Sequence, residues 1–115
     1  MATIREMVRD IQKEVRDTPD LLPDRAAALA TRLSALLGNV NDEIRAADAA
    51  YAATLLSLLE SEKAANRARI RAEMTPEYAR KREARDTKEL AVELIRTLKY
   101  FMRAKEQEYE AAKNL

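Results

Sequence analysis

Apolar side chains recur every three or four positions along most of the chain, a spacing that predicts helices. The first run covers residues 3–17, and its apolar positions are Ile4, Met7, Val8, Ile11 and Val15. Thr3 and Glu6 fit the capping box that begins many helices. A single apolar stripe does not stabilise so short a helix in isolation. We therefore expect residues 1–18 to form an N-terminal helix that docks on its own chain or on a neighbouring subunit.

Residues 19–23 interrupt this pattern and predict a linker. Pro19 and Pro23 restrict the residues that precede them, and neither has a backbone N–H to donate. Leu21 and Leu22 are too apolar for an exposed tether. We therefore expect both leucines to be tucked against the protein.

The longest apolar stripe begins after this linker. Its positions step by three and four along the chain: Leu29, Leu33, Leu36, Val40, Ile44, Ala47, Tyr51, Leu55 and Leu58. The phase continues through Gly38, although glycine costs a helix interior roughly 1 kcal/mol relative to alanine. The pattern predicts one long helix over residues 24–74. The alternative is two helices, with Gly38 directly after the end of the first.

A return helix is predicted for residues 75–112. Thr75 is a good capping residue, Pro76 suits the first helical position, and Glu77 suits the first turn. The apolar positions that follow are Tyr78, Ala84, Ala91, Leu94, Ile95, Leu98, Phe101, Met102 and Tyr109. If the chain reverses near residue 75, Leu98 lies opposite Tyr51 or Ala52.

These elements together predict an all-α fold in a single helical domain, residues 1–115. Its expected architecture is a long antiparallel helical hairpin plus an N-terminal helix. Leu58 with Leu59, and Phe101 with Met102, widen the apolar faces beyond what one partner helix covers. This surplus predicts assembly into a homo-oligomer, such as a ring or bundle of hairpins. A compact three-helix monomer is the alternative.

The composition argues against several kinds of chemistry. The chain has no histidine, cysteine or tryptophan. It therefore lacks the commonest general base, the nucleophilic thiol and the usual transition-metal ligands. We expect no enzymatic activity, no cofactor and no metal site.

The first residues do not fit a signal peptide, and no apolar run approaches the ~20 residues that cross a bilayer, so we expect a cytoplasmic protein without a membrane partner.

Basic residues gather between positions 63 and 88. This stretch holds nine lysines and arginines against four aspartates and glutamates, a charge of +5 in a chain whose total is +1. At the tip of a hairpin, such a cluster would neutralise nucleic-acid phosphates. The candidate nucleic-acid-binding residues are Lys63, Arg67, Arg69, Arg71, Arg80, Lys81, Arg82 and Arg85. The alternative is a solvated helix surface whose charges pair at i,i+4 spacing. Tyr78 is the only aromatic residue in the stretch, so the signal for base stacking is weak.

One short motif adds a family resemblance. Arg67-Ala68-Arg69-Ile70 precedes a turn and a second long helix, and Tyr78 follows with basic residues after it. This layout resembles the T4-type phage recombination mediators (UvsY-like proteins), whose motif reads Lys-Ala-Arg-Leu in the same place. The family implies a ring-shaped homo-oligomer that binds single-stranded DNA and helps to load a recombinase over a single-strand binding protein. Arg67 and Arg69 would contact the DNA. Arg71 and Ala72 stand where the family has an aromatic pair, a difference that concerns the substrate more than the architecture.

The sequence thus favours a non-enzymatic, single-stranded nucleic-acid-binding protein of the phage mediator type. Two other classes stay open. One is a helical scaffold, adaptor or inhibitor that acts through protein contacts. The other is an oligomeric sponge for small anionic nucleotides.

Overall fold

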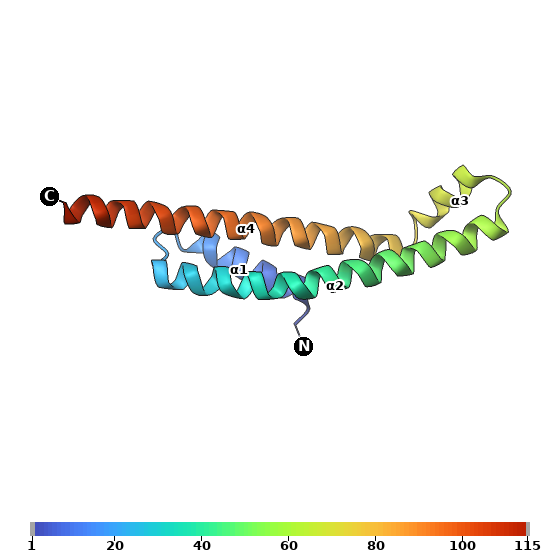
Figure 1. The fold of residues 1–115 in the computed structure, drawn as a ribbon. Coiled ribbons are helices and arrows are strands. Elements are labelled where there is room, and N and C mark those ends of the chain that lie inside the picture. Colours follow the sequence, from blue (N-terminus) through green and yellow to red (C-terminus); the bar gives the residue numbers. More distant parts are fainter. Residues whose placement is uncertain (1, 115) are drawn as a thin grey trace. The chain divides into compact units, whose positions relative to one another are not determined.

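The predicted all-α fold class is confirmed for the residues that the structure describes. A computed structural model gives residues 2–114, with the side chains of 104 and 105 left undescribed. Within that range the chain forms four helices and no strand (Figure 1). The helices are α1 (Ile4–Asp17), α2 (Pro23–Ser61), α3 (Ala65–Ala72) and α4 (Pro76–Lys113). None of the described helices is both long enough and apolar enough to cross a membrane.

The chain divides into two compact units. The terminal unit comprises Met1–Gly38 and Glu89–Leu115, and the hairpin unit comprises Asn39–Lys88. Helices α2 and α4 are each divided between the units, with one segment of each helix in the terminal unit and the other in the hairpin unit. All the candidate nucleic-acid-binding residues belong to the hairpin unit.

The terminal unit contains the larger apolar core. Its buried residues are Val8, Ile11, Leu21, Ala26, Leu29, Ala30, Leu33, Leu36, Ala91, Leu94 and Leu98. Helix α1 begins as predicted, since the Glu6 backbone N–H donates to Thr3 Oγ1 at 3.1 Å. Its stripe is buried at Val8 and Ile11, so α1 docks on its own chain.

The linker between α1 and α2 is held by one leucine and one ion pair. Leu21 is buried as expected, but Leu22 is exposed, so the prediction that both leucines are tucked in is wrong for Leu22. Beside them, Arg25 donates two hydrogen bonds to the Glu14 carboxylate, at 2.6 and 2.7 Å. This bidentate contact joins the start of α2 to α1.

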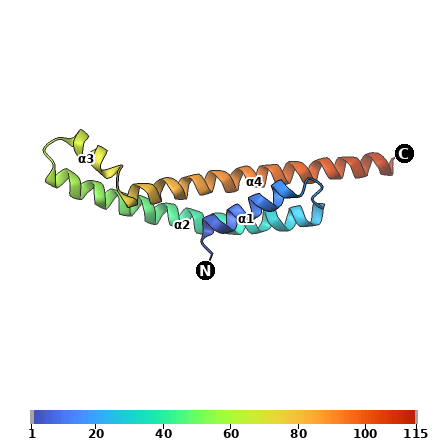
Figure 2. The ribbon, with the colours of Figure 1, turned by 180° about the vertical axis from the view of Figure 1, so that it is seen from behind.

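Helix α2 runs through Gly38 without interruption, so the single-helix prediction is confirmed at that point. It is wrong farther on, because α2 ends at Ser61 and does not reach residue 74. At this end the Leu58 carbonyl accepts from both the Ser61 hydroxyl and the Glu62 backbone N–H, at 3.2 and 2.9 Å. The chain then doubles back, and α3 lies beside the last turns of α2 (Figures 1 and 2).

Burial of small side chains accounts for this reversal. Ala68 and Ala72 are both fully buried on α3. Folding back removes their apolar surface from water at the expense of a few helical hydrogen bonds. Arg71 on α3 also forms an ion pair with Glu62, just beyond the end of α2.

The early reversal changes the expected register between α2 and α4. Tyr51 does not face Leu98; it faces Tyr78, with their ring centroids 5.4 Å apart. Leu98 instead belongs to the core of the terminal unit, with Leu29 and Leu33. The expected pairing is wrong because residues 62–75 form a turn, a short helix and a second turn. Helix α4 therefore starts beside Tyr51, ten residues before the end of α2.

The start of α4 is as predicted from the sequence. Pro76 is its first residue, and the Tyr78 backbone N–H donates to Thr75 Oγ1 at 3.4 Å. The core of the hairpin unit, in contrast, is thin: its buried apolar residues are Val40, Ala47, Ala68, Ala72 and Ala84. Small side chains bring the backbones close together but bury little area, so polar and aromatic contacts carry more weight there.

A first prediction concerns Gly38. A Cβ built at this position meets no atom within 4 Å, and the glycine does not have a positive φ. Gly38→Ala should therefore raise the free energy of unfolding by about 0.5–1 kcal/mol, because alanine restricts the unfolded chain more than glycine does. Chemical denaturation followed by circular dichroism measures it. The reverse change at exposed Ala35 on the same helix is the matched control and should be destabilising by a similar amount. A loss of stability in Gly38→Ala would contradict a regular helix at this point.

A second prediction separates the core from the surface of α2. Leu33 is fully buried, whereas Leu56 is 58% exposed. Leu33→Ala should lower the free energy of unfolding by about 2–5 kcal/mol through lost burial and a cavity. Leu56→Ala should change it by less than about 1 kcal/mol. Equal effects of the two substitutions on the denaturation midpoint would show that this assignment of buried and exposed faces is wrong.

Candidate nucleic-acid interface

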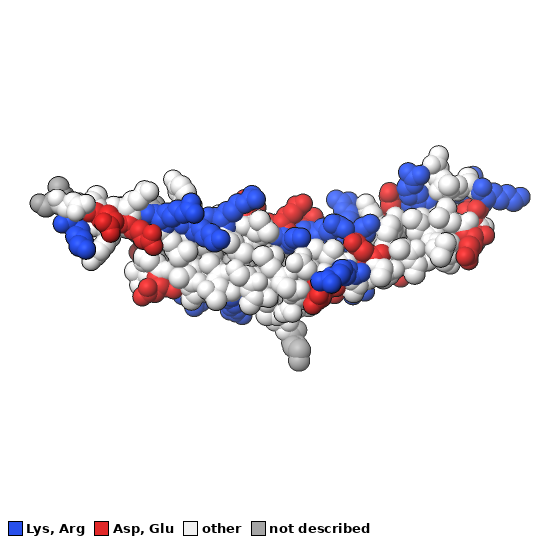
Figure 3. Space-filling model, viewed as in Figure 1, with Lys and Arg blue, Asp and Glu red and all other residues white. Residues whose placement is uncertain are grey.

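The eight candidate cations come from two segments of the hairpin unit. Lys63 lies in the turn after α2, and three arginines lie on α3: Arg67, Arg69 and Arg71. The other four lie in the first turns of α4: Arg80, Lys81, Arg82 and Arg85. Figure 3 shows basic side chains over α3 and the start of α4, with acidic side chains among them. The structure therefore brings the candidates into one unit, but their surroundings differ.

Three of the arginines are paired with carboxylates of α2 or of the turn that follows it. Arg80 donates to both oxygens of Glu43, at 2.7 and 3.2 Å, and Arg85 donates to Asp48 at 2.8 Å. Arg71 is paired with Glu62. These arginines hold α4 and α3 to α2, and much of their charge is already compensated.

The acidic partners also change the charge of the region. Counting residues 63–88 alone gives +5, because Glu43, Asp48 and Glu62 lie outside that stretch. The whole hairpin unit has ten basic and nine acidic residues, a net charge of +1. Its capacity to attract a polyanion therefore depends on how individual charges are placed.

The ion pair between Arg80 and Glu43 perturbs both groups. The hydrogen bonds from Arg80 lower the pKa of Glu43 below its ordinary value, and the Arg80 charge adds to the effect, although partial burial opposes it. The same hydrogen bonds raise the pKa of Arg80. Both side chains therefore stay ionised at neutral pH and bound to each other. The pair therefore links α4 to α2.

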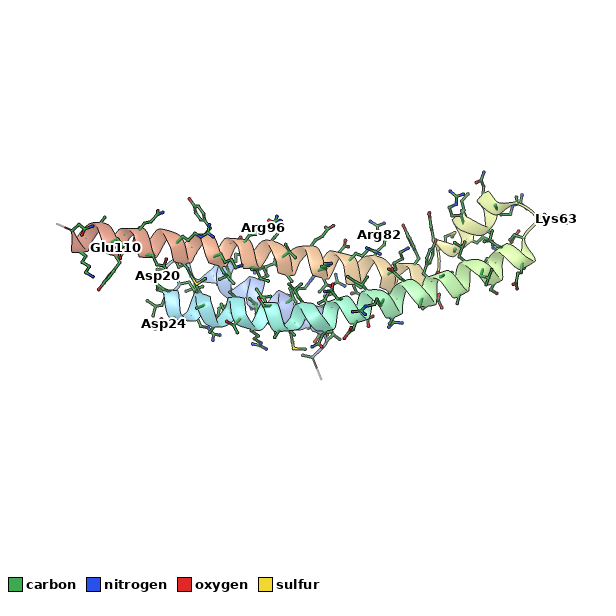
Figure 4. All side chains as sticks on the ribbon, viewed as in Figure 1. Asp20, Asp24, Lys63, Arg82, Arg96 and Glu110 are labelled. Carbon is green, nitrogen blue, oxygen red and sulfur yellow. The ribbon has the colours of Figure 1, made fainter. Side chains whose placement is uncertain are left out.

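Lys63, Arg67 and Arg69 are placed differently. All three are exposed, and no carboxylate in the described residues lies within ion-pair distance of them. Arg67 and Arg69 flank the buried Ala68, so the packing of α3 turns both guanidinium groups towards solvent. Figure 4 shows Lys63 at the turn that precedes α3. We call these three residues the α3 cations, although Lys63 lies in the turn just before α3. An anion can approach them without displacing a carboxylate.

The other two candidates lie over aromatic rings. Lys81 Nζ is 4.5 Å from the centroid of the Tyr51 ring, and the Arg82 guanidinium carbon is 5.9 Å from that of Tyr78. The two rings are tilted by 46° to each other. We call these four side chains the tyrosine cluster. Sequence reasoning found Tyr78 but missed Tyr51, since only the true register brings Tyr51 next to it.

Other kinds of site have little support in the described residues. They contain no group of three or more acidic, histidine or cysteine side chains that could hold a metal ion. A shallow depression in the terminal unit is lined by Pro23, Glu106, Tyr109 and Glu110. Its two carboxylates disfavour a phosphate ligand. The hairpin unit is therefore the candidate site.

Comparison of the chain with protein-family models, with curated proteins and with solved structures found no match. The function is consequently argued from the chemistry of the hairpin unit.

A third prediction tests the Arg80–Glu43 pair. Because the pair lowers the pKa of folded Glu43, its stabilising effect is present above the ordinary carboxyl pKa and is lost as pH falls through the lowered value. In Arg80→Gln, the pKa of Glu43 should return towards its ordinary value, and less stability should be lost between about pH 5 and pH 3. Carboxyl NMR titration measures the first effect, and thermal melts measure the second.

Arg82→Gln is the matched control for that titration. It removes a positive charge from the same helix but leaves the contacts of Glu43 intact. The pKa of Glu43 should therefore stay low in this variant. A Glu43 pKa that is the same in wild type and Arg80→Gln would contradict the pairing.

Proposed function

We propose that this protein is a non-enzymatic binder of single-stranded nucleic acid that contacts phosphates through the α3 cations Lys63, Arg67 and Arg69. The proposal extends to the role suggested by the resemblance to phage recombination mediators. In that role the protein acts as a homo-oligomer and assists a recombinase in the presence of a single-strand binding protein. The observation that carries it is the exposure of these three cations without acidic partners.

The three α3 cations are assigned the phosphate contacts because they are not already hydrogen-bonded to carboxylates of the described residues. A phosphate that approaches Arg80 or Arg85 must compete with a carboxylate that is already hydrogen-bonded. A phosphate that approaches Arg67 or Arg69 displaces only water and counterions, which is the step that favours polyelectrolyte binding. We therefore assign phosphate contacts to the α3 cations and a mainly structural role to Arg71, Arg80 and Arg85.

Magnitudes support the oligomeric part of the proposal. Three phosphate contacts on a single strand give a salt dependence with a slope of only about −2 in log K against log salt. Such binding is weak at physiological salt. Repetition of the same three cations around a homo-oligomer would multiply the contacts and strengthen the local field. Recombination-mediator activity on a long strand therefore requires self-association in this proposal.

A second candidate function is favoured by apolar side chains in the same unit. Leu56, Ile70 and Met74 are 58%, 61% and 82% exposed, and Leu59 is also exposed. A contiguous exposed patch of apolar side chains is typical of protein contacts. A scaffold or adaptor that binds another protein through them would associate in a manner that high salt does not weaken. Binding to nucleic acid would be weakened by salt, which separates the two functions.

A fourth prediction tests the phosphate contacts. Arg67→Ala combined with Arg69→Ala should weaken binding to a labelled single-stranded oligonucleotide at low salt. It should also reduce the slope of log K against log salt by about 1.4, the value expected for two lost contacts. Fluorescence anisotropy titrations at several salt concentrations measure both quantities.

The matched control is Arg9→Ala combined with Arg103→Ala. It changes the net charge equally but alters exposed arginines of the terminal unit. This variant should bind like the wild type. Equal weakening by the two double variants would mean that only overall charge matters, and absence of wild-type binding at low salt would refute the proposed function.

A further inference from the structure

The tyrosine cluster is the feature of the hairpin unit that phosphate binding does not explain. Tyr51 lies in the C-terminal third of α2, and Tyr78 lies in the first turn of α4. Their ring centroids lie 5.4 Å apart, yet both side chains are only partly buried. The remaining apolar packing of this unit is made mainly by alanines, so two large rings at its surface leave aromatic area within reach of solvent.

A cationic side chain lies over each ring. Lys81 lies over Tyr51, and Arg82 lies over Tyr78. Arg82 is exposed, and the described residues offer it no carboxylate partner. Figure 4 shows it projecting from α4 on the side away from α2. Such a side chain can leave the ring without breaking an ion pair.

We propose that Tyr78, supported by Tyr51, is a stacking platform for an unpaired nucleobase, and that Arg82 moves from the ring to a neighbouring phosphate when the base binds. This proposal rests on the proposed function and identifies the ligand as the base of a single strand. Every base has a π face, so the platform accepts any sequence. Stacking of a base on an aromatic ring is a stronger contact than an exposed cation–π pair, which makes the exchange favourable.

The platform also supplies selectivity for single strands. In a duplex the faces of the bases are stacked on one another and cannot reach a side chain unless a base is flipped out. The α3 cations attract phosphates of single and double strands alike. The tyrosine cluster is therefore the element that makes the hairpin unit prefer unpaired nucleic acid.

The test compares two single-stranded probes of equal length and charge. One is an oligothymidylate, and the other has the same phosphodiester backbone with abasic sites in place of bases. The wild type should bind the oligothymidylate roughly 5- to 150-fold more tightly, the range that stacking of one base provides. Tyr78→Leu should bring this preference close to one and leave affinity for the abasic probe unchanged. Tyr78→Phe, which keeps the ring, should retain it.

Tyr100→Leu is the control for loss of a tyrosine, because Tyr100 is exposed in the terminal unit. It should keep the preference. Quenching of tyrosine fluorescence in the wild type gives a second readout that does not depend on how well Tyr78→Leu folds: the oligothymidylate should quench it and the abasic probe should not.

The outcomes separate this inference from the function on which it rests. Equal affinity of the wild type for the two probes, or an undiminished preference in Tyr78→Leu, would overturn the stacking platform and leave phosphate binding intact. Failure of the wild type to bind either probe at low salt would overturn both.

Discussion

The register between α2 and α4 in the hairpin unit is the constraint on which the other features depend. It is set where α2 stops at Ser61 and α3 folds back to bury Ala68 and Ala72. Helix α4 then begins beside Tyr51, before the last ten residues of α2. This position brings Glu43 to Arg80, Asp48 to Arg85 and Tyr51 to Tyr78. A hairpin with its only turn near residue 75 would make none of these contacts.

The register sorts a run of similar basic residues into different roles. Arg71, Arg80 and Arg85 hold helices together through ion pairs, and Lys81 and Arg82 cover aromatic rings. Of the eight candidate cations, Lys63, Arg67 and Arg69 are exposed and have no such contact with the residues that the structure describes. Partly exposed ion pairs add little stability individually, but several of them across an alanine-rich seam fix its alignment. The density of positive charge in a sequence is therefore a poor measure of the charge that a ligand meets.

Local chemistry explains which features could be predicted from the sequence. The cap at Thr3, the start of α4 at Pro76 and the passage of α2 through Gly38 depend on a few adjacent residues or on an unbroken periodicity. The end of α2 has no comparable signal, because residues 62–64 include neither glycine nor proline. The break results from tertiary burial of two alanines, and its only trace in the sequence is the loss of aliphatic side chains after Leu59.

The candidate site, too, could be predicted only in part, because some of its contacts depend on tertiary packing. The basic stretch could be located from composition alone, but pairing with Glu43 and Asp48 requires knowledge of the register between helices. Tyr51 was missed for the same reason.

Nuclear Overhauser contacts between tyrosine ring protons and their neighbours test the register between α2 and α4 most directly. Contacts between the rings of Tyr51 and Tyr78 are the predicted result, and contacts between Tyr51 and Leu98 would contradict it.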